Sequence, residues 1–121
     1  MVFFCSDLEL EIDRMRTTQI LFNLISNAIK FSADAGVITI ECEYKRIEWY
    51  TFQVEISVID HGIGISEEDK AHIFNPFFKT KDMQSKSLNA NSHGLGLNIC
   101  QQIARGLNGE ITFKSVRGAG S

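Results

Sequence analysis

Residues 23–30 read Asn23-Leu-Ile-Ser-Asn27-Ala-Ile-Lys30, and this stretch decides the fold. It falls inside a predicted helix that follows an N-cap at Asp13 and runs to about Phe31. At about 100° per residue, the two asparagines and the lysine lie within about 60° of one another. An asparagine in mid-helix costs helix propensity, so this aligned polar stripe invites a functional explanation. The opposite sector is apolar and is expected to face the core, with Leu21, Leu24, Ile25, Ala28 and Ile29.

Other stretches alternate apolar and polar residues as strands do. Val37–Tyr44 and Phe52–Val58 are expected to pair as an antiparallel hairpin across Lys45–Thr51. Residues 2–6 predict a further short strand, and Glu110–Val116 predicts the last one.

Two helices are expected in the second half of the chain. Ser66 can cap a short helix whose first turn is acidic. Gly96–Leu107 predicts a longer helix whose turn Gly109 ends. Residues 79–93 are polar and followed by glycine, which is typical of a mobile loop. The residues of the longer helix expected to face inward are Ile99, Ile103 and Leu107.

The composition excludes several classes of protein. With 121 residues, 44% of them apolar, the chain fits one globular domain over 1–121. A formal net charge of -3 gives no reason to expect a nucleic-acid surface. Its 3 cysteines are widely spaced and predict neither a disulfide framework nor a zinc site. Without a long apolar run or a signal pattern, the piece is expected to be soluble and cytosolic, and its abrupt ends indicate a fragment of a longer protein.

Asp60-His61-Gly62-Ile63-Gly64 directly follows the second predicted hairpin strand. A carboxylate in that place needs a partner or water. The two glycines allow a tight turn and a close approach of the backbone. Alone, this motif often marks only a turn after a strand, and His61 is interpreted as incidental.

Two further motifs have both a structural and a functional interpretation. Gly94-Leu95-Gly96-Leu97 opens a helix whose N-terminal amides favour phosphates, although the third glycine of a dinucleotide fingerprint is absent. The aromatic segment from Phe74 to Phe78 can anchor a loop in the core. Lys79 and Lys81 after it are either solvated or contact phosphates.

In this order, the four motifs resemble the ATP-binding catalytic domain of sensor histidine kinases. This domain belongs to the GHKL ATPase superfamily (Bergerat fold), with gyrase, the MutL repair proteins and a heat-shock chaperone. The resemblance extends from about Asp13 to Gly120, with Ser92 and His93 departing from the usual G-x-G-L-G-L. The expected fold is a two-layer α/β sandwich, with a mixed, mostly antiparallel sheet of about five strands and three helices on one face.

The resemblance also implies ATP and Mg2+ as cofactors and a role for each motif. Asn27 would give its amide oxygen to Mg2+, Lys30 would reach the phosphates, and Asp60 would accept a hydrogen bond from the adenine amine. The implied ATP-binding residues are Asn23, Asn27, Lys30, Asp60, Gly62, Gly64, Phe78, Lys79, Lys81, Gly94, Leu95, Gly96 and Leu97.

The resemblance predicts the catalytic domain of a two-component sensor kinase, which donates the ATP γ-phosphate to a histidine on a separate dimerisation domain. His61, His72 and His93 lie outside the family's phosphoacceptor motif, so no catalytic residue is assigned within the chain. The expected partners are an upstream dimerisation and phosphotransfer domain and a response regulator receiver domain, with a monomeric fragment and a homodimeric parent. The alternatives are a GHKL-type ATPase that acts as a conformational clamp, and a degenerate module that binds nucleotide or only a protein.

Overall fold

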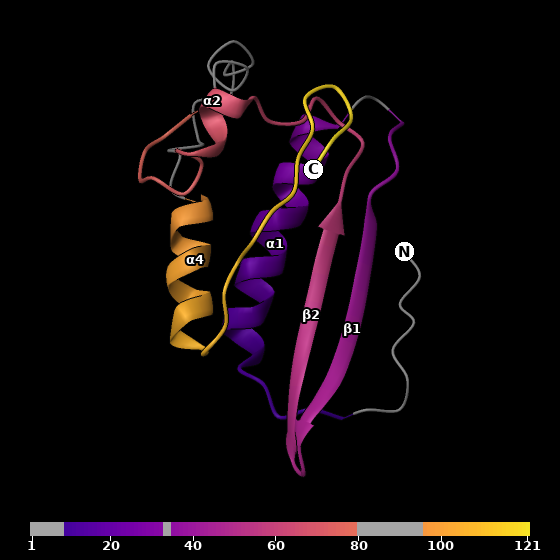
Figure 1. Cartoon of the computed structure of the whole chain (residues 1–121), viewed down its shortest axis with the longest axis vertical. Helices are drawn as coiled ribbons and strands as arrows, with labels where there is room; N and C mark the ends of the chain where they lie inside the picture. The colour runs from indigo at the N-terminus through magenta and orange to yellow at the C-terminus, as the bar shows by residue number, and fades with distance from the viewer. Residues whose placement is uncertain (1–8, 33–34, 80–95) are drawn as a thin grey trace.

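The long helix α1 spans Arg14–Phe31 and is the element on which the rest is assembled. A computed structural model describes residues 9–32, 35–79 and 96–121. The Asp13 carboxylate accepts a hydrogen bond of 2.9 Å from the Arg16 N–H, which confirms the predicted N-cap. The helix ends where the Ser32 N–H donates to the Ala28 carbonyl. Figure 1 shows α1 between the helix α4 and a two-stranded sheet.

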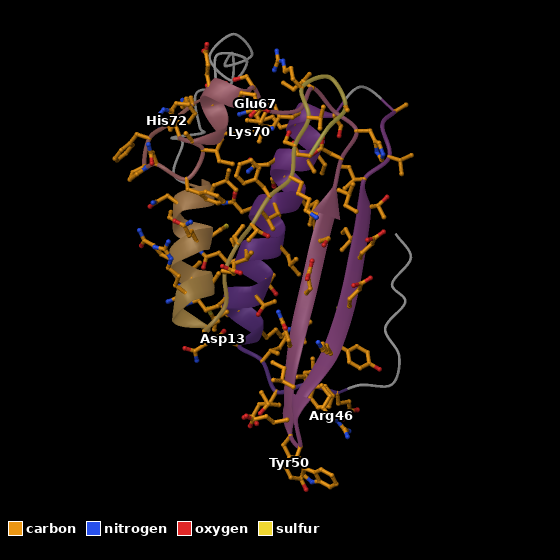
Figure 2. The ribbon with its side chains drawn as sticks, in the orientation of Figure 1. Asp13, Arg46, Tyr50, Glu67, Lys70 and His72 are labelled. Atoms are coloured by element: carbon orange, nitrogen blue, oxygen red, sulfur yellow. The ribbon has the colours of Figure 1, made fainter. Side chains whose placement is uncertain are left out.

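The sheet consists of β1, Thr39–Glu48, and β2, Thr51–Ile59, paired antiparallel as predicted. Its strands are longer than predicted, because the expected connection Lys45–Thr51 itself pairs in part. Lys45 lies opposite Gln53, and Arg46 lies opposite Phe52 with its guanidinium 5.5 Å from the ring centroid. Only Trp49 and Tyr50 remain between the strands, and Figure 2 shows Tyr50 at the tip of this hairpin.

Two shorter helices follow. The predicted cap at Ser66 is confirmed, since its hydroxyl accepts from the Asp69 N–H at the start of α2, Glu67–Lys70. The helix α4, Gly96–Gly106, is also where the sequence predicts it. Its inward face differs in part from the prediction, because Ile103 is half-buried but Ile99 and Leu107 are exposed.

Small side chains fill the contact between α4 and α1 instead. Cys100 is fully buried and Ala104 is nearly so. The Cys100 thiol lies 4.0 Å from the Ile20 carbonyl oxygen of α1. Small residues let two helices approach closely, so the larger residues on either side of this seam remain in water. On α1 the prediction of an inward Ile29 is likewise wrong, since this side chain is 64% exposed.

The predicted last strand, Glu110–Val116, joins no sheet in the described part of the chain. Its side chains do alternate between exposed and half-buried or buried, as the pattern predicts. Phe113 packs its ring against that of Phe74 at 5.8 Å, so the segment docks through side chains and not through a ladder. The only bridge found in it pairs Val116 with Gly120.

The mixed α/β class is therefore confirmed, with three helices among the described residues, whereas the five-stranded sheet is not confirmed. Of the described helices, only α1 contacts the sheet, so the expectation of three helices packed on one sheet face is wrong. The helix α4 packs on α1 instead (Figure 1). The predicted strand at 2–6 and the loop at 80–93 lie outside the described residues.

Candidate nucleotide site

Asn23 of the asparagine stripe lies against Gly96, the first described residue of the glycine motif. A Cβ added to Gly96 would lie 2.5 Å from Oδ1 and 2.7 Å from Nδ2 of Asn23. The amide of Asn23 therefore occupies the space beside the first residue of α4, which a larger residue at position 96 would take. Asn27 lies one turn further along α1 and is half-buried.

The loop after β2 attaches to the C-terminal end of the same helix. The Asp60 carboxylate accepts a hydrogen bond of 2.8 Å from the Gly62 N–H, which folds the loop into a turn. The Ile63 N–H donates to the Phe31 carbonyl at 3.2 Å. A Cβ on Gly62 would lie 2.1 Å from that carbonyl oxygen, so glycine is required here by backbone contact.

These two attachments place Asn27 midway between them. Gly96 meets α1 at residue 23 and Gly62 meets it at residue 31, and each is about 6 Å from residue 27 along the helix axis. Lys30 belongs to the same part of α1, with its ammonium nitrogen 5.4 Å from the centroid of the Phe31 ring. Described residues from three of the four sequence motifs therefore lie along the C-terminal half of one helix.

The last residues of the chain hold the Asp60 loop from the other side, which the sequence analysis did not predict. Asp60 and Ser121 exchange backbone hydrogen bonds of 2.9 and 3.2 Å. The Gly118 N–H donates to the Ile63 carbonyl at 2.8 Å. Gly64 has φ +65°, and a Cβ there would meet the Val116 carbonyl oxygen at 2.1 Å. The two glycines at 118 and 120, both with positive φ, were the sequence signal for this turn.

The Ser115 hydroxyl stabilises the C-terminal turn by hydrogen bonds, and the sequence analysis did not identify this residue. The hydroxyl accepts a hydrogen bond of 2.8 Å from the Ile65 N–H and donates one of 2.9 Å to the Gly120 carbonyl. It also lies 2.8 Å from the hydroxyl oxygen of Ser121. Ser115 is buried, so these bonds replace water for each group involved.

The aromatic segment Phe74–Phe78 has half-buried ends and an exposed middle. The Phe74 ring packs on Phe113, and its carbonyl accepts a hydrogen bond of 3.1 Å from the side chain of Asn98 in α4. Phe77 has φ +62° and is largely exposed. Phe78 is half-buried and lies 5.6 Å from the His72 ring. The segment thus joins α2 to the start of α4.

Of the remaining predicted site residues, some lie within the described part of the chain and some lie outside it. Lys79 and Leu97 are both half-buried. Three predicted residues lie outside the described residues: Lys81, Gly94 and Leu95.

With this geometry in place, comparison with known proteins identifies the family. A family described as histidine kinase-, DNA gyrase B-, and HSP90-like ATPase matches residues 12–121. The chain belongs to this family. The prediction of an ATP-binding domain of the sensor histidine kinase type is confirmed by this match and by the relatives.

Curated relatives from bacteria and fungi are similar over nearly the whole chain. Sensor histidine kinase WalK of Bacillus subtilis is 35% identical over 95% of this chain and 18% of its own length. Aerobic respiration control sensor protein ArcB of Escherichia coli K12 is 37% identical over 90% of this chain and 13% of its own length. Histidine protein kinase 1 of Candida albicans is 33% identical over 97% of this chain and 5% of its own length. The chain therefore spans less than a fifth of the length of these three relatives.

A solved structure shows the same fold. The mycobacterial sensor histidine kinase MprB matches with a TM-score of 0.59 at 22% identity, over 80% of this chain and 56% of that one. As for membranes, none of the helices in the described part combines the length and apolar character that a crossing requires.

Proposed function

We propose that this chain binds ATP with Mg2+ between α1, the Asp60 loop and the start of α4, and donates the γ-phosphate to a histidine on another domain. The contact between Asn23 and Gly96 carries the proposal, because it joins two motifs that are 73 positions apart in the sequence. Membership of the ATPase family supports it. The names of the relatives support transfer to a histidine over hydrolysis alone.

Each part of the site has a proposed task. Asp60 keeps one carboxylate oxygen on the Gly62 N–H, and its other oxygen is proposed to accept the hydrogen bond from the adenine amine. Lys30, together with Lys79 and Lys81, is proposed to neutralise phosphate charge. The N-terminal amides of α4 would favour the same phosphates.

Asn27 offers the kind of oxygen ligand that a magnesium ion arriving with the nucleotide would take. No cluster of three His, Cys, Asp or Glu side chains that could hold a metal occurs among the described residues. Mg2+ commonly takes one or two protein oxygens and fills its other positions with phosphate oxygens and water. The amide oxygen of Asn27 would be the protein ligand, and the ion would neutralise charge on the β- and γ-phosphates.

Phosphotransfer needs a partner under this proposal. His61 and His72 are both exposed and neither is placed as an acceptor. The histidine would be supplied by a dimerisation and phosphotransfer domain of the parent protein, which would pass the phosphate to a receiver domain. The isolated chain would bind nucleotide as a monomer.

Calorimetry with ADP and Mg2+ tests the site. In Asp60→Asn the amide oxygen can still accept from the Gly62 N–H, so the loop is kept while the second oxygen becomes a donor that opposes the adenine amine. Affinity should fall by about 1.5–3 kcal/mol, the range for a hydrogen bond to a charged group. Asn27→Ala should weaken binding in the presence of Mg2+ and have little effect with EDTA. Unchanged affinity in both variants would rule out the proposed site.

A further inference from the structure

The outward face of α1 carries an apolar stripe that nothing in the nucleotide site uses. Met15, Phe22 and Ile29 are 79%, 73% and 64% exposed, respectively. Their spacing of seven residues places them within about 40° of one another on the helix. Three large apolar side chains thus follow one line along α1, and we call this line the α1 stripe.

The spacing of the α1 stripe matches a helical partner. Apolar residues every seven positions, with others three or four residues between them, form the seam along which two helices pack. The half-buried Ile25 occupies one of those intermediate positions, and the polar Thr18 occupies the other. A docked helix would therefore meet side chains in register over four turns of α1.

The charge of α1 defines the partner further. The helix contains Arg14, Arg16 and Lys30 and no acidic residue, although the chain as a whole has a formal net charge of -3. At about 100° per residue, Arg14 lies about 80° to one side of the stripe and Arg16 about 120° to the other, both in the first turn of α1. A second copy of α1 would bring like charges together, whereas a helix with acidic flanks would complement them.

We propose that the α1 stripe binds an amphipathic helix outside these 121 residues, through an apolar seam bordered by Asp or Glu. This interaction is additional to nucleotide binding and uses a different face of α1. The stripe lies about 100° around the helix from Asn23, which contacts Gly96. The docked helix would therefore leave the nucleotide site open.

Two synthetic peptides test the proposal by fluorescence anisotropy with the full 121-residue chain. Both have 21 residues and Leu at the seam positions; one has Glu at the flanking positions and the other has Lys. The chain should bind the Glu peptide at least tenfold more tightly than the Lys peptide. Equal binding of the two peptides, or no binding of the Glu peptide, would overturn the proposal.

Substitutions locate the contact. Phe22→Gln should weaken binding of the Glu peptide about tenfold or more, and it places a polar residue where the side chain is already in water. The matched control is Trp49→Gln at the hairpin tip, where the side chain is 75% exposed; its affinity for the peptide should equal that of the unsubstituted chain. Equal losses in the two variants would show nonspecific apolar binding and would refute the assignment.

Two measurements distinguish binding of an acidic helix from a failure of the nucleotide site and from binding of a second copy of the chain. ADP affinity of Phe22→Gln should be unchanged, so that failure of peptide binding and failure of the nucleotide site are distinguished. Analytical ultracentrifugation should find a monomer at the concentrations used. A dimer that Phe22→Gln dissociates would mean that the stripe binds a second copy, and the proposed acidic helix would be wrong.

Discussion

Replacing Gly62 by Ala tests whether the Asp60 loop is seated on the end of α1. The added Cβ would lie 2.1 Å from the Phe31 carbonyl oxygen, whereas ordinary contact begins at 3.4 Å. The loop must therefore move by more than 1 Å relative to α1, because the clash is with backbone and no side chain can rotate away. A shift of this size also breaks the 3.2 Å hydrogen bond from the Ile63 N–H to the same oxygen.

The expected cost follows from these two effects. Overpacking costs about 1–3 kcal/mol, and the lost hydrogen bond adds about 0.5–1.5 kcal/mol. The free energy of unfolding should fall by about 1.5–4.5 kcal/mol. For a domain of this size, Tm should then fall by about 6–18 °C, at about 4 °C per kcal/mol.

Thermal unfolding followed by circular dichroism measures this change. Gly106→Ala in α4 is the matched control, since its added Cβ would have no described heavy atom within 4 Å apart from the adjoining residues and backbone of its own helix. Because Ala loses less conformational entropy in a helix than Gly does, the control should be as stable as the unsubstituted chain or gain up to about 1 kcal/mol. If Gly62→Ala melts within 1 °C of the unsubstituted chain, the close contact with α1 is refuted.

Three other changes have defined outcomes. Gly96→Ala should lower ADP affinity by displacing the Asn23 amide, and should do so much less in an Asn23→Ala background, a coupling that a double-mutant cycle detects; additive effects would mean that the two residues do not touch. Ser115→Ala should lower the free energy of unfolding by about 1–3 kcal/mol, because it removes the acceptor of the Ile65 N–H and one of the two hydrogen bonds to the Gly120 carbonyl, and Ser115→Thr should recover part of this in urea titrations. Burial raises the pKa of the Cys100 thiol. The stability that this neutral buried thiol contributes is therefore complete below the ordinary thiol pKa, and it is lost as pH rises through the higher pKa of the folded state. Cys100→Ala should therefore show a smaller alkaline loss of Tm, and an equal loss in both proteins would contradict this.

Local signals in the sequence were sufficient for the individual elements. Asp13 and Ser66 cap the helices that the sequence predicts there. The helix α4 also lies where the sequence predicts a helix. Caps and periodicity act over a few residues, so they can be interpreted without knowing the fold. The hairpin boundaries were wrong because Arg46 and Phe52 favour continued pairing through a cross-strand contact, and a loop-like composition does not exclude such a contact.

The inward faces could not be predicted in the same way. Ile29 and Ile99 were expected in the core because they are large and apolar, yet both are exposed. Which side of an amphipathic helix is covered depends on what packs against it, and Cys100 and Ala104 form that contact here. The same reasoning explains Glu110–Val116, which alternates as a strand does but docks through Phe113 on Phe74.

The sequence by itself determined the family, the order of the motifs and the type of each residue that the chemistry needs. It also determined that Asn23, Asn27 and Lys30 share one side of a helix, since helical spacing alone fixes that. Only the tertiary structure decided that Gly96 rests on Asn23, that Gly62 rests on Phe31, and that Ser121 pairs with Asp60. These contacts join residues far apart in the chain, and backbone groups that look alike in every sequence make most of them.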